Sequence, residues 1–275
     1  YAIGLAGLFR FPLRSMQLLS SAWPLFLISL MAIVSVVWSI NPALSGVMAF
    51  RLNGTVLFAF FLVAAFSWQG LIQVIAATGL FLGVTSAVLA LGPGNMGIMT
   101  ETHVGAWSGW WLEKNRFGSV MAFAIVASAT CAVLRRSVLW AISALFLFVL
   151  LILSDSATSL LATLAALGMA FVIWIWRRGP VVLGVTLYGG VAVLAAIVIA
   201  VTTAPEVVTD LLGREATFTG RTGIWQEAIG HIQIKPWFGW GYGAFWDTDP
   251  GPADWVRERL DFKVSNAHNG WLDMS

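Results

Sequence analysis

Long apolar runs separated by short polar connections dominate about the first 200 residues of the chain. These runs approach the ~20 residues that an α-helix needs to cross the hydrocarbon core of a bilayer. Tryptophans near the ends of several runs, among them Trp23, Trp68 and Trp140, are typical of a membrane interface. The predicted membrane-spanning helices are residues 23–40, 51–68, 71–91, 118–134, 138–153, 158–176 and 181–201. The pattern therefore predicts an all-α, polytopic transmembrane protein.

Composition supports this fold class. Hydrophobic residues make up 59% of the 275 residues, charged residues make up only 10%, and the mean hydropathy is +0.86. Soluble domains carry roughly 25% charged residues, so a soluble globular protein is excluded. The one cysteine, Cys131, lies inside an apolar run, which excludes a disulfide framework and a thiolate metal site.

The chain divides by polarity into a membrane part and a polar, aromatic last quarter. We predict a transmembrane helical domain over 1–202, an extracytoplasmic loop region with short helices over 203–270, and the start of a further, truncated span over 271–275. Residues 41–53 are predicted to form a short interfacial segment, with Arg51 reaching the headgroups. The acid-free first segment, which opens with Tyr1, favours a truncated N-terminus over a signal peptide.

Arginine placement predicts the orientation in the membrane. If the first segment faces the cytoplasm, alternate connections place every arginine of the short loops inside. These are Arg10, Arg14, Arg135, Arg136, Arg177 and Arg178. The same orientation puts all 13 acidic residues on or near the outer face. The outer face then receives residues 92–117, residues 154–157 and the long segment after Val201.

The polar last quarter contains a predicted amphipathic helix that ends before Pro236 and is capped by Thr219 or Gly220. Its apolar face comprises Ile224, Trp225, Ala228, Ile229 and Ile232. Arg221 would lie in the first turn, where an arginine beside unpaired N–H groups can bind an anion. The alternative is a surface ion pair with Glu215 or Glu227.

Two other polar elements lie on the predicted outer face. Lys114, Asn115 and Arg116 stand at the mouth of the fourth span, where they could bind an anionic headgroup or only anchor the helix. Asp155 is interpreted as a helix cap. The sequence Asp247-Thr248-Asp249 has the form of a metal-binding DxD motif, but we interpret residues 247–252 as a solvated turn.

Five motifs, in order along the chain, resemble the O-antigen ligase and polymerase superfamily, and most closely its ExoQ-type exopolysaccharide polymerases. They are KNRFG (114–118), LSDSATSLL (153–161), TGRTGIW (219–225), PWFGWGYGAFW (236–246) and NAHNGWLD (266–273). The chain departs from the family at Glu113, where relatives commonly have a histidine, and near Ala157, where they commonly have a basic residue. Donor contacts from these two segments are correspondingly less secure.

The resemblance implies a multi-pass protein of the bacterial plasma membrane, with an active site that faces the periplasm. The donor would be an oligosaccharide on polyprenyl diphosphate, and the acceptor a glycan on a second lipid. Polysaccharide export and chain-length proteins would be further partners, whereas no nucleic acid, metal or other cofactor is expected. An inverting glycosyltransferase is implied, with alternatives in an O-antigen ligase acting on lipid A-core, a transporter, or an assembly scaffold.

The resemblance also assigns roles to residues. His268 would be the general base, and Arg221 would bind the diphosphate. Secondary candidates for substrate binding are Arg116, Lys114 and Asn115 of the KN element, Asn269 of the HN pair, and more weakly Arg214. Catalysis would require that these side chains, which come from separate outer segments, converge on one pocket.

Overall fold

The computed structural model describes residues 10, 17, 20–101, 103–203, 219–260, 266–267 and 270–273. The chain packs as two compact units. Unit 1 comprises Tyr1–Ala65 and Glu206–Ser275, and unit 2 comprises Phe66–Pro205. The predicted division into a membrane domain and a loop region follows the sequence order, whereas the packing groups the first helices with the last quarter of the chain.

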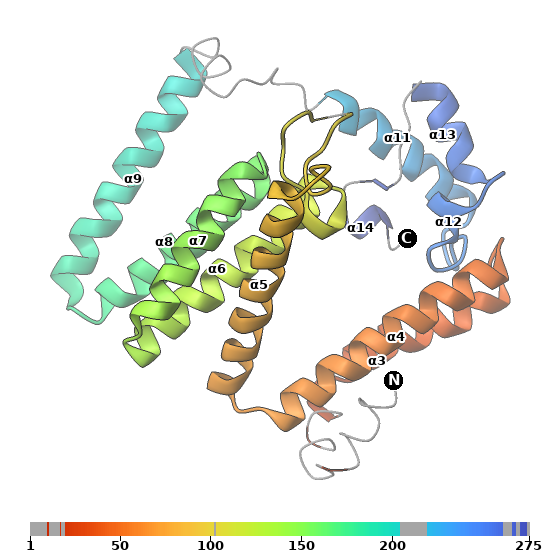
Figure 1. The fold of residues 1–275 in the computed structure, drawn as a ribbon. Helices are drawn as coiled ribbons and strands as arrows, with labels where there is room; N and C mark the ends of the chain where they lie inside the picture. The colour runs from red at the N-terminus through yellow and green to blue at the C-terminus, as the bar shows by residue number, and fades with distance from the viewer. Residues whose placement is uncertain are drawn as a thin grey trace. The chain divides into compact units, whose positions relative to one another are not determined.

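Unit 2 is a bundle of antiparallel apolar helices built around α6 (Figure 1). Its helices are α5 (Trp68–Leu91), α6 (Lys114–Arg135), α7 (Val138–Leu153), α8 (Ala157–Trp176) and α9 (Pro180–Thr203), with the short 3₁₀ helix η2 (Gly109–Trp111) before α6. Helix α6 packs against α5, α7 and α8, whereas α9 contacts α8. Helix α6 is therefore the central helix of the unit, and its ends set the geometry of both ends of the bundle.

The core of unit 2 lies where α6 meets α7. Phe117, Met121 and Leu147 are completely buried there, together with Leu151. Close approach of α5 depends on small residues, because a Cβ on Gly83 would lie 2.6 Å from Cδ2 of Leu147. Tight packing of this kind fixes the rotation of α6 about its own axis and hence the direction of the side chains at its first turn.

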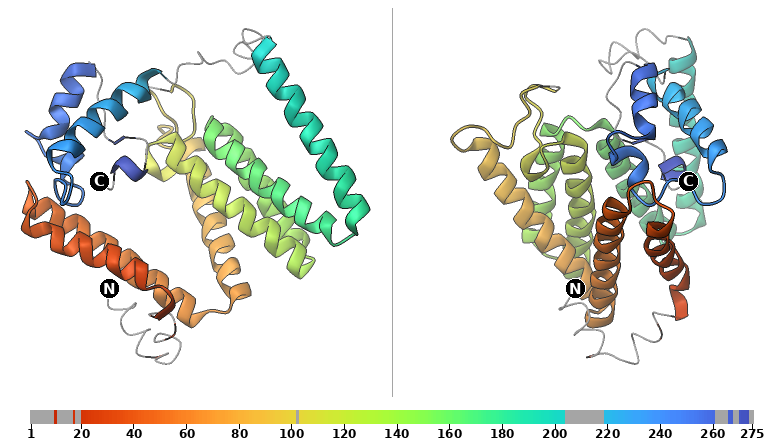
Figure 2. Two further views of the ribbon diagram at one scale, coloured as in Figure 1. Left: turned by 180° about the vertical axis from the view of Figure 1, so that it is seen from behind. Right: turned by 90° about the vertical axis from the view of Figure 1, so that its right-hand side faces the viewer.

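Unit 1 joins two apolar helices to the polar last quarter of the chain. Its elements are α3 (Trp23–Val34), the 3₁₀ helix η1 (Ser35–Val37), α4 (Pro42–Ala65), α11 (Thr219–Ile234), α12 (Ala244–Asp247), α13 (Pro252–Leu260) and α14 (Gly270–Asp273). Helices α3 and α4 pack together, with the rings of Phe26 and Phe60 stacked at 4.9 Å. Figure 2 shows these two helices side by side.

The glycine and aromatic run of the last quarter docks on the connection between α3 and α4. Ile40 N donates to Trp240 O at 3.1 Å, and Ser45 Oγ donates to Tyr242 O at 2.9 Å. Gly241 adopts a φ of +98°, and a Cβ at this position would overlap Ser39. A residue other than glycine would therefore be strained in conformation and blocked by its neighbour.

The seven predicted spans correspond to α3 with η1, α4, α5, α6, α7, α8 and α9. Four of the described helices, α4, α5, α6 and α8, are long and apolar enough to cross a membrane, and the other apolar helices are shorter in the stretches described. The prediction of an all-α, polytopic membrane fold is confirmed. The described residues form no strand beyond the isolated bridge between Ile98 and Trp107.

The prediction of a separate interfacial segment at residues 41–53 is wrong. Helix α4 runs without interruption from Pro42 to Ala65. Asn53 does not break it, because its Nδ2 donates to Ala49 O one turn back at 2.8 Å. The proline stands at the first position of the helix, where it has no backbone N–H to lose. Arg51 consequently lies nine residues into a continuous helix and not at its start.

Candidate functional site

The N-terminus of α6 is capped by a carboxylate from the chain itself. Glu113 accepts hydrogen bonds from Asn115 N at 2.9 Å and from Arg116 N at 2.7 Å. The cap starts the helix at Lys114, earlier than the predicted start at Gly118. Because Glu113 occupies the place at which a helix N-terminus would bind an external anion, backbone N–H groups at this position contribute little to ligand binding.

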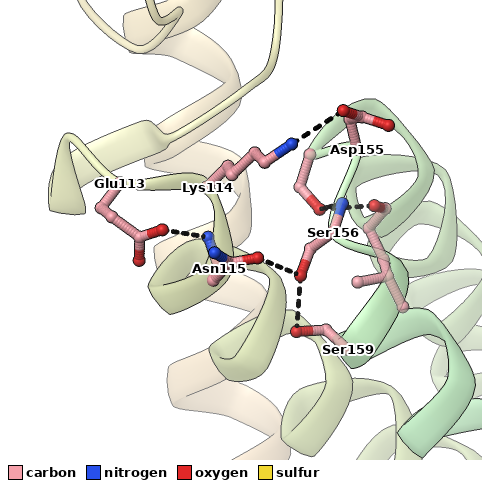
Figure 3. Close-up of polar contacts among 8 residues, drawn as sticks. Glu113, Lys114, Asn115, Asp155, Ser156 and Ser159 are labelled. Carbon is pink, nitrogen blue, oxygen red and sulfur yellow. Dashed lines mark hydrogen bonds and ion pairs between the residues drawn. The ribbon is translucent and has the colours of Figure 1, made fainter. Parts of the chain in front are cut away.

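Lys114 forms a buried ion pair. Its side chain is only 4% exposed, and Nζ lies 2.8 Å from Oδ2 of Asp155 in the turn between α7 and α8 (Figure 3). The interpretation of Asp155 as a helix cap is wrong, since the N-cap of α8 is Ser156. Asp155 has a left-handed backbone with φ of +50°, and its carboxylate holds the cation of a distant segment. Lys114 therefore links the start of α6 to the turn between α7 and α8, and its charge is already paired.

A chain of hydroxyl and amide groups continues from this pair. Ser156 Oγ lies 3.0 Å from Asn115 Oδ1 and 3.0 Å from Ser159 Oγ. Figure 3 shows these groups bridging the first turn of α6 and the start of α8. Gly118 permits the approach, because a Cβ there would lie 2.7 Å from Cβ of Ser156. Asn115 is thus engaged with a neighbouring segment, although much of its side chain is exposed.

Arg116 is the exposed cation of this group. Its backbone N–H is used in the cap, but among the described residues its guanidinium makes no ion pair, since those pairs involve Lys114, Arg257 and Arg259. Of the three candidates from the KN element, Arg116 is the one whose side chain makes neither an ion pair nor a hydrogen bond with the described residues, since Lys114 pairs with Asp155 and Asn115 with Ser156.

Helix α11 places the backbone of Arg221 in its first turn, as predicted, and ends at Ile234, two residues before Pro236. The helix already includes Thr219, so the predicted cap at Thr219 or Gly220 lies inside it. On its apolar face Ile224 and Ala228 are buried, whereas Ile229 is 45% exposed. The side chain of Arg221 lies outside the described residues, as do Arg214, His268 and Asn269.

A hydrogen bond ties α11 to the segment that precedes His268 in the sequence. Trp225 Nε1 donates to Ala267 O at 2.9 Å, and Ala267 is completely buried. Both residues belong to an apolar cluster with Ile224, Trp246 and Val256. Arg221 is four residues, or ~6 Å of helix rise, before Trp225. Ala267, which directly precedes the predicted base His268, therefore contacts the helix that carries Arg221.

Ion pairs hold the remaining helices of the last quarter. Glu227, one predicted partner for Arg221, accepts two hydrogen bonds from Arg259 at 2.9 and 3.1 Å. Asp254 accepts from Gly251 N at 2.7 Å and from Arg257 at 2.7 Å. The hydrogen bond from the Gly251 backbone and then the Arg257 guanidinium lower the pKa of Asp254 below its usual value.

Asp247 and Asp249 are both exposed, and the described residues hold no cluster that could bind a metal ion.

Three residues that were not site candidates from the sequence stand out within their own units. Asp155 and Trp225 act through contacts between segments distant in the sequence, which no local pattern announces. Arg51 could have been found, because an arginine inside an uninterrupted apolar run is rare and usually functional. It is exposed, one turn beyond Met48, which packs against Gly243 of the glycine and aromatic run.

The fold and these motifs define a polytopic membrane protein whose polar elements match one family. The family model described as O-antigen ligase matches residues 142–275. The exopolysaccharide production protein ExoQ of Rhizobium meliloti (strain 1021) is 32% identical over 158 residues, which cover 54% of this chain and 35% of that protein. No solved structure matches the chain. These matches support the O-antigen ligase superfamily, and within it similarity to ExoQ, as the motifs predicted, and the match spans about a third of that relative's length.

Proposed function

We propose that this chain is part of a glycosyltransferase that extends or transfers glycans carried on polyprenyl diphosphate, in exopolysaccharide biosynthesis at the outer face of the plasma membrane. The family and the ExoQ relative support this class of activity. The observation that carries the site assignment is the hydrogen bond between Trp225 and Ala267, because it joins the helix of Arg221 to the segment beside His268.

The chemistry suits these residue types. When the C1–O bond to the lipid diphosphate breaks, negative charge develops on the leaving diphosphate, and a fixed guanidinium such as Arg221 stabilises it without a metal ion. The acceptor hydroxyl attacks the opposite face of the sugar, so the anomeric carbon is inverted. His268 accepts the hydroxyl proton, because a free imidazole has a reference pKa of about 6.5, and such a role typically contributes roughly 10²–10⁴-fold.

We assign secondary phosphate contacts to Arg116 and add Arg51 to the candidates. Both guanidinium groups are exposed, and the described ion pairs include neither. A polyprenyl diphosphate presents its charge at the membrane surface, where an arginine near the end of a span can reach by extending its side chain. Lys114 acts differently in this proposal, because Asp155 already neutralises it.

The decisive experiment incubates the purified full-length protein with a defined polyprenyl-diphosphate oligosaccharide and measures elongated lipid-linked product. His268→Ala is expected to stay folded and lose at least ~10²-fold in rate. His103→Ala is the matched control, because His103 is exposed in another loop and should leave the rate unchanged. Normal synthesis by His268→Ala at equal expression would refute the catalytic assignment and favour a transporter or scaffold.

The arginine assignments are tested by the same assay over a range of donor concentrations. Arg221→Gln should lower kcat, because its charge compensation grows in the transition state. Arg116→Gln and Arg51→Gln should mainly raise KM, because these residues would bind the diphosphate equally before and during the reaction. No change of either parameter in both of the last two variants would remove them from the site.

The description of the matching family favours a second candidate, an O-antigen ligase that transfers the glycan to lipid A-core. The two activities use the same donor and differ in the acceptor. Supplying both acceptors in one reaction distinguishes them by product mass. Glycan found only on lipid A-core would establish the ligase, whereas elongated polyprenyl-linked glycan would establish the polymerase.

A further inference from the structure

A small polar cavity opens between the start of α5 and the end of α6, at the end of unit 2 opposite the Lys114 and Asp155 pair. It has a volume of about 230 Å³ and is lined by Gln69, Gln73, Cys131, Leu134 and Arg135. Helices α5 and α6 pack against each other. The buried cluster of Ile72, Ala76, Ala127 and Cys131 lies next to it along the same helices.

The lining of this cavity is rich in hydrogen-bond donors. Gln69 and Gln73 are four residues apart on α5 and so share a face, and Cys131 and Arg135 share a face of α6 in the same way. The guanidinium offers five N–H donors, and each glutamine adds two more. Within the described residues of unit 2, no carboxylate lies at this end of the bundle, since Glu101, Glu113 and Asp155 belong to the opposite connections.

The charge of Arg135 therefore has no counter-ion in the described part of the unit. Arg136, Arg177 and Arg178 at the same end add further positive charge. Where a lysine of the opposite end is buried, the chain supplies Asp155 to neutralise it. At this cavity the chain supplies no such partner to the exposed Arg135. A planar guanidinium with amide donors is a combination that suits the oxygens of a phosphate.

The position of the cavity along the helices indicates that such a phosphate would belong to a lipid headgroup. Trp68 begins α5 and is 73% exposed, and Trp140 packs against the cluster beside the cavity. Tryptophans at the ends of apolar helices mark the level of lipid headgroups. Basic pockets between transmembrane helices on the cytoplasmic side are known to receive anionic headgroups, and the arginine distribution predicts that side for this end.

We propose that the cavity lined by Gln69, Gln73 and Arg135 binds the phosphate of an anionic phospholipid headgroup. The site is separate from the proposed glycosyl-transfer residues and does not depend on that function. Arg135 supplies the paired N–H donors for two phosphate oxygens, Gln73 donates to a third, and the acyl chains lie along the apolar surfaces of α5 and α6. Such a lipid would fasten the start of α5 to the end of α6.

The test measures the thermal unfolding midpoint of the purified full-length protein in detergent with added short-chain phosphatidylglycerol. A ligand that binds only the folded state raises this midpoint. We expect a rise with phosphatidylglycerol, little change with phosphatidylcholine, and loss of the rise in Arg135→Gln. Arg178→Gln is the matched control, because Arg178 lies at the same end but stacks on Trp174 at 4.4 Å and does not line this cavity.

Further variants and a second probe complete the design. Gln73→Leu retains the cation but removes the amide, so it should reduce the response even if Arg135→Gln does not fold. Inorganic phosphate that reproduces the rise in the wild type but not in Gln73→Leu would support the phosphate site and assign it to a soluble ion. Equal responses in the wild type, Arg135→Gln, Gln73→Leu and Arg178→Gln, or an equal response to phosphatidylcholine, would overturn the proposal.

Discussion

The two ends of unit 2 treat charge in opposite ways. At the mixed-charge end, formed by residues 92–117 and 154–157, Glu113 caps α6 and Asp155 neutralises Lys114. At the basic end, the arginines at 135, 136, 177 and 178 form no ion pair with a carboxylate of the described residues. The same helix, α6, contributes to both ends. Charged side chains join segments of the chain at the mixed-charge end, whereas those of the basic end are exposed to the surroundings.

This difference shows that basic residues play two distinct roles in this membrane protein. An arginine on a short loop of the basic end fits the positive-inside rule and needs no partner from the chain. A lysine buried at the mixed-charge end would be costly without one, so the chain supplies an aspartate from a turn about forty residues away. Membership of a motif therefore does not show that a cation is available to a ligand.

The largest expected effect comes from leaving the buried lysine unpaired. Asp155→Ala should lower the free energy of unfolding by about 2–3 kcal/mol, somewhat less than a fully buried pair because Asp155 itself is 73% exposed. Lys114→Met, which removes the buried charge and keeps the length of the side chain, should cost less. Thermal or denaturant unfolding of the purified variants measures both values.

The double variant gives the internal control for this comparison. Lys114→Met combined with Asp155→Ala should be more stable than Asp155→Ala alone, because the unpaired ammonium is gone. If Asp155→Ala is as stable as the wild type, the pair contributes nothing to stability, and Lys114 would return to the set of available ligands.

The next effect probes the close packing that brings the mixed-charge end together. Gly118→Ala places a Cβ 2.7 Å from Cβ of Ser156 and should cost about 1–3 kcal/mol through overpacking. Activity should fall with it, because the first turn of α6 moves away from α8. Gly168→Ala on α8 is the matched control. It meets nothing within 4 Å, so the higher helix propensity of alanine should leave the protein as stable or slightly more stable.

The sequence predicted the positions of the helices well, but it did not predict which side chains contact one another between them. Apolar length and arginine spacing sufficed for α5 to α9, since a membrane span is a local property of the chain. The partnership of Lys114 with Asp155, and of Trp225 with Ala267, depends on which helices pack side by side. Asp155 was interpreted as a cap because an acid before a helix usually is one. Arg51 was misplaced because Pro42 and Asn53 resemble breaks, although neither breaks α4.

A smaller effect is expected at the basic end. Arg178→Gln removes the guanidinium that lies 4.4 Å from the ring of Trp174, and an exposed contact of this kind contributes roughly 0.5–1 kcal/mol. The loss should stay within that range in detergent, because no buried partner is left unpaired. A loss as large as that of Asp155→Ala would show that the two ends do not differ as described.

The smallest effect concerns a paired carboxylate that lies outside the bundle, Asp254, and is measured by changing the pH. The Gly251 backbone and then Arg257 lower the pKa of Asp254 from its ordinary value of 3.8. A carboxylate with a lowered folded-state pKa contributes its stability above the unfolded value, and the contribution is lost as the pH falls through the folded value. Acidification below about pH 4 should therefore loosen the start of α13, and Asp254→Asn should remove that part of the pH dependence while it lowers stability at neutral pH. The free energy of unfolding, measured from about pH 6 to about pH 2 in both proteins, gives the difference. Identical titrations would mean that the Asp254 carboxylate is not held by these partners in solution.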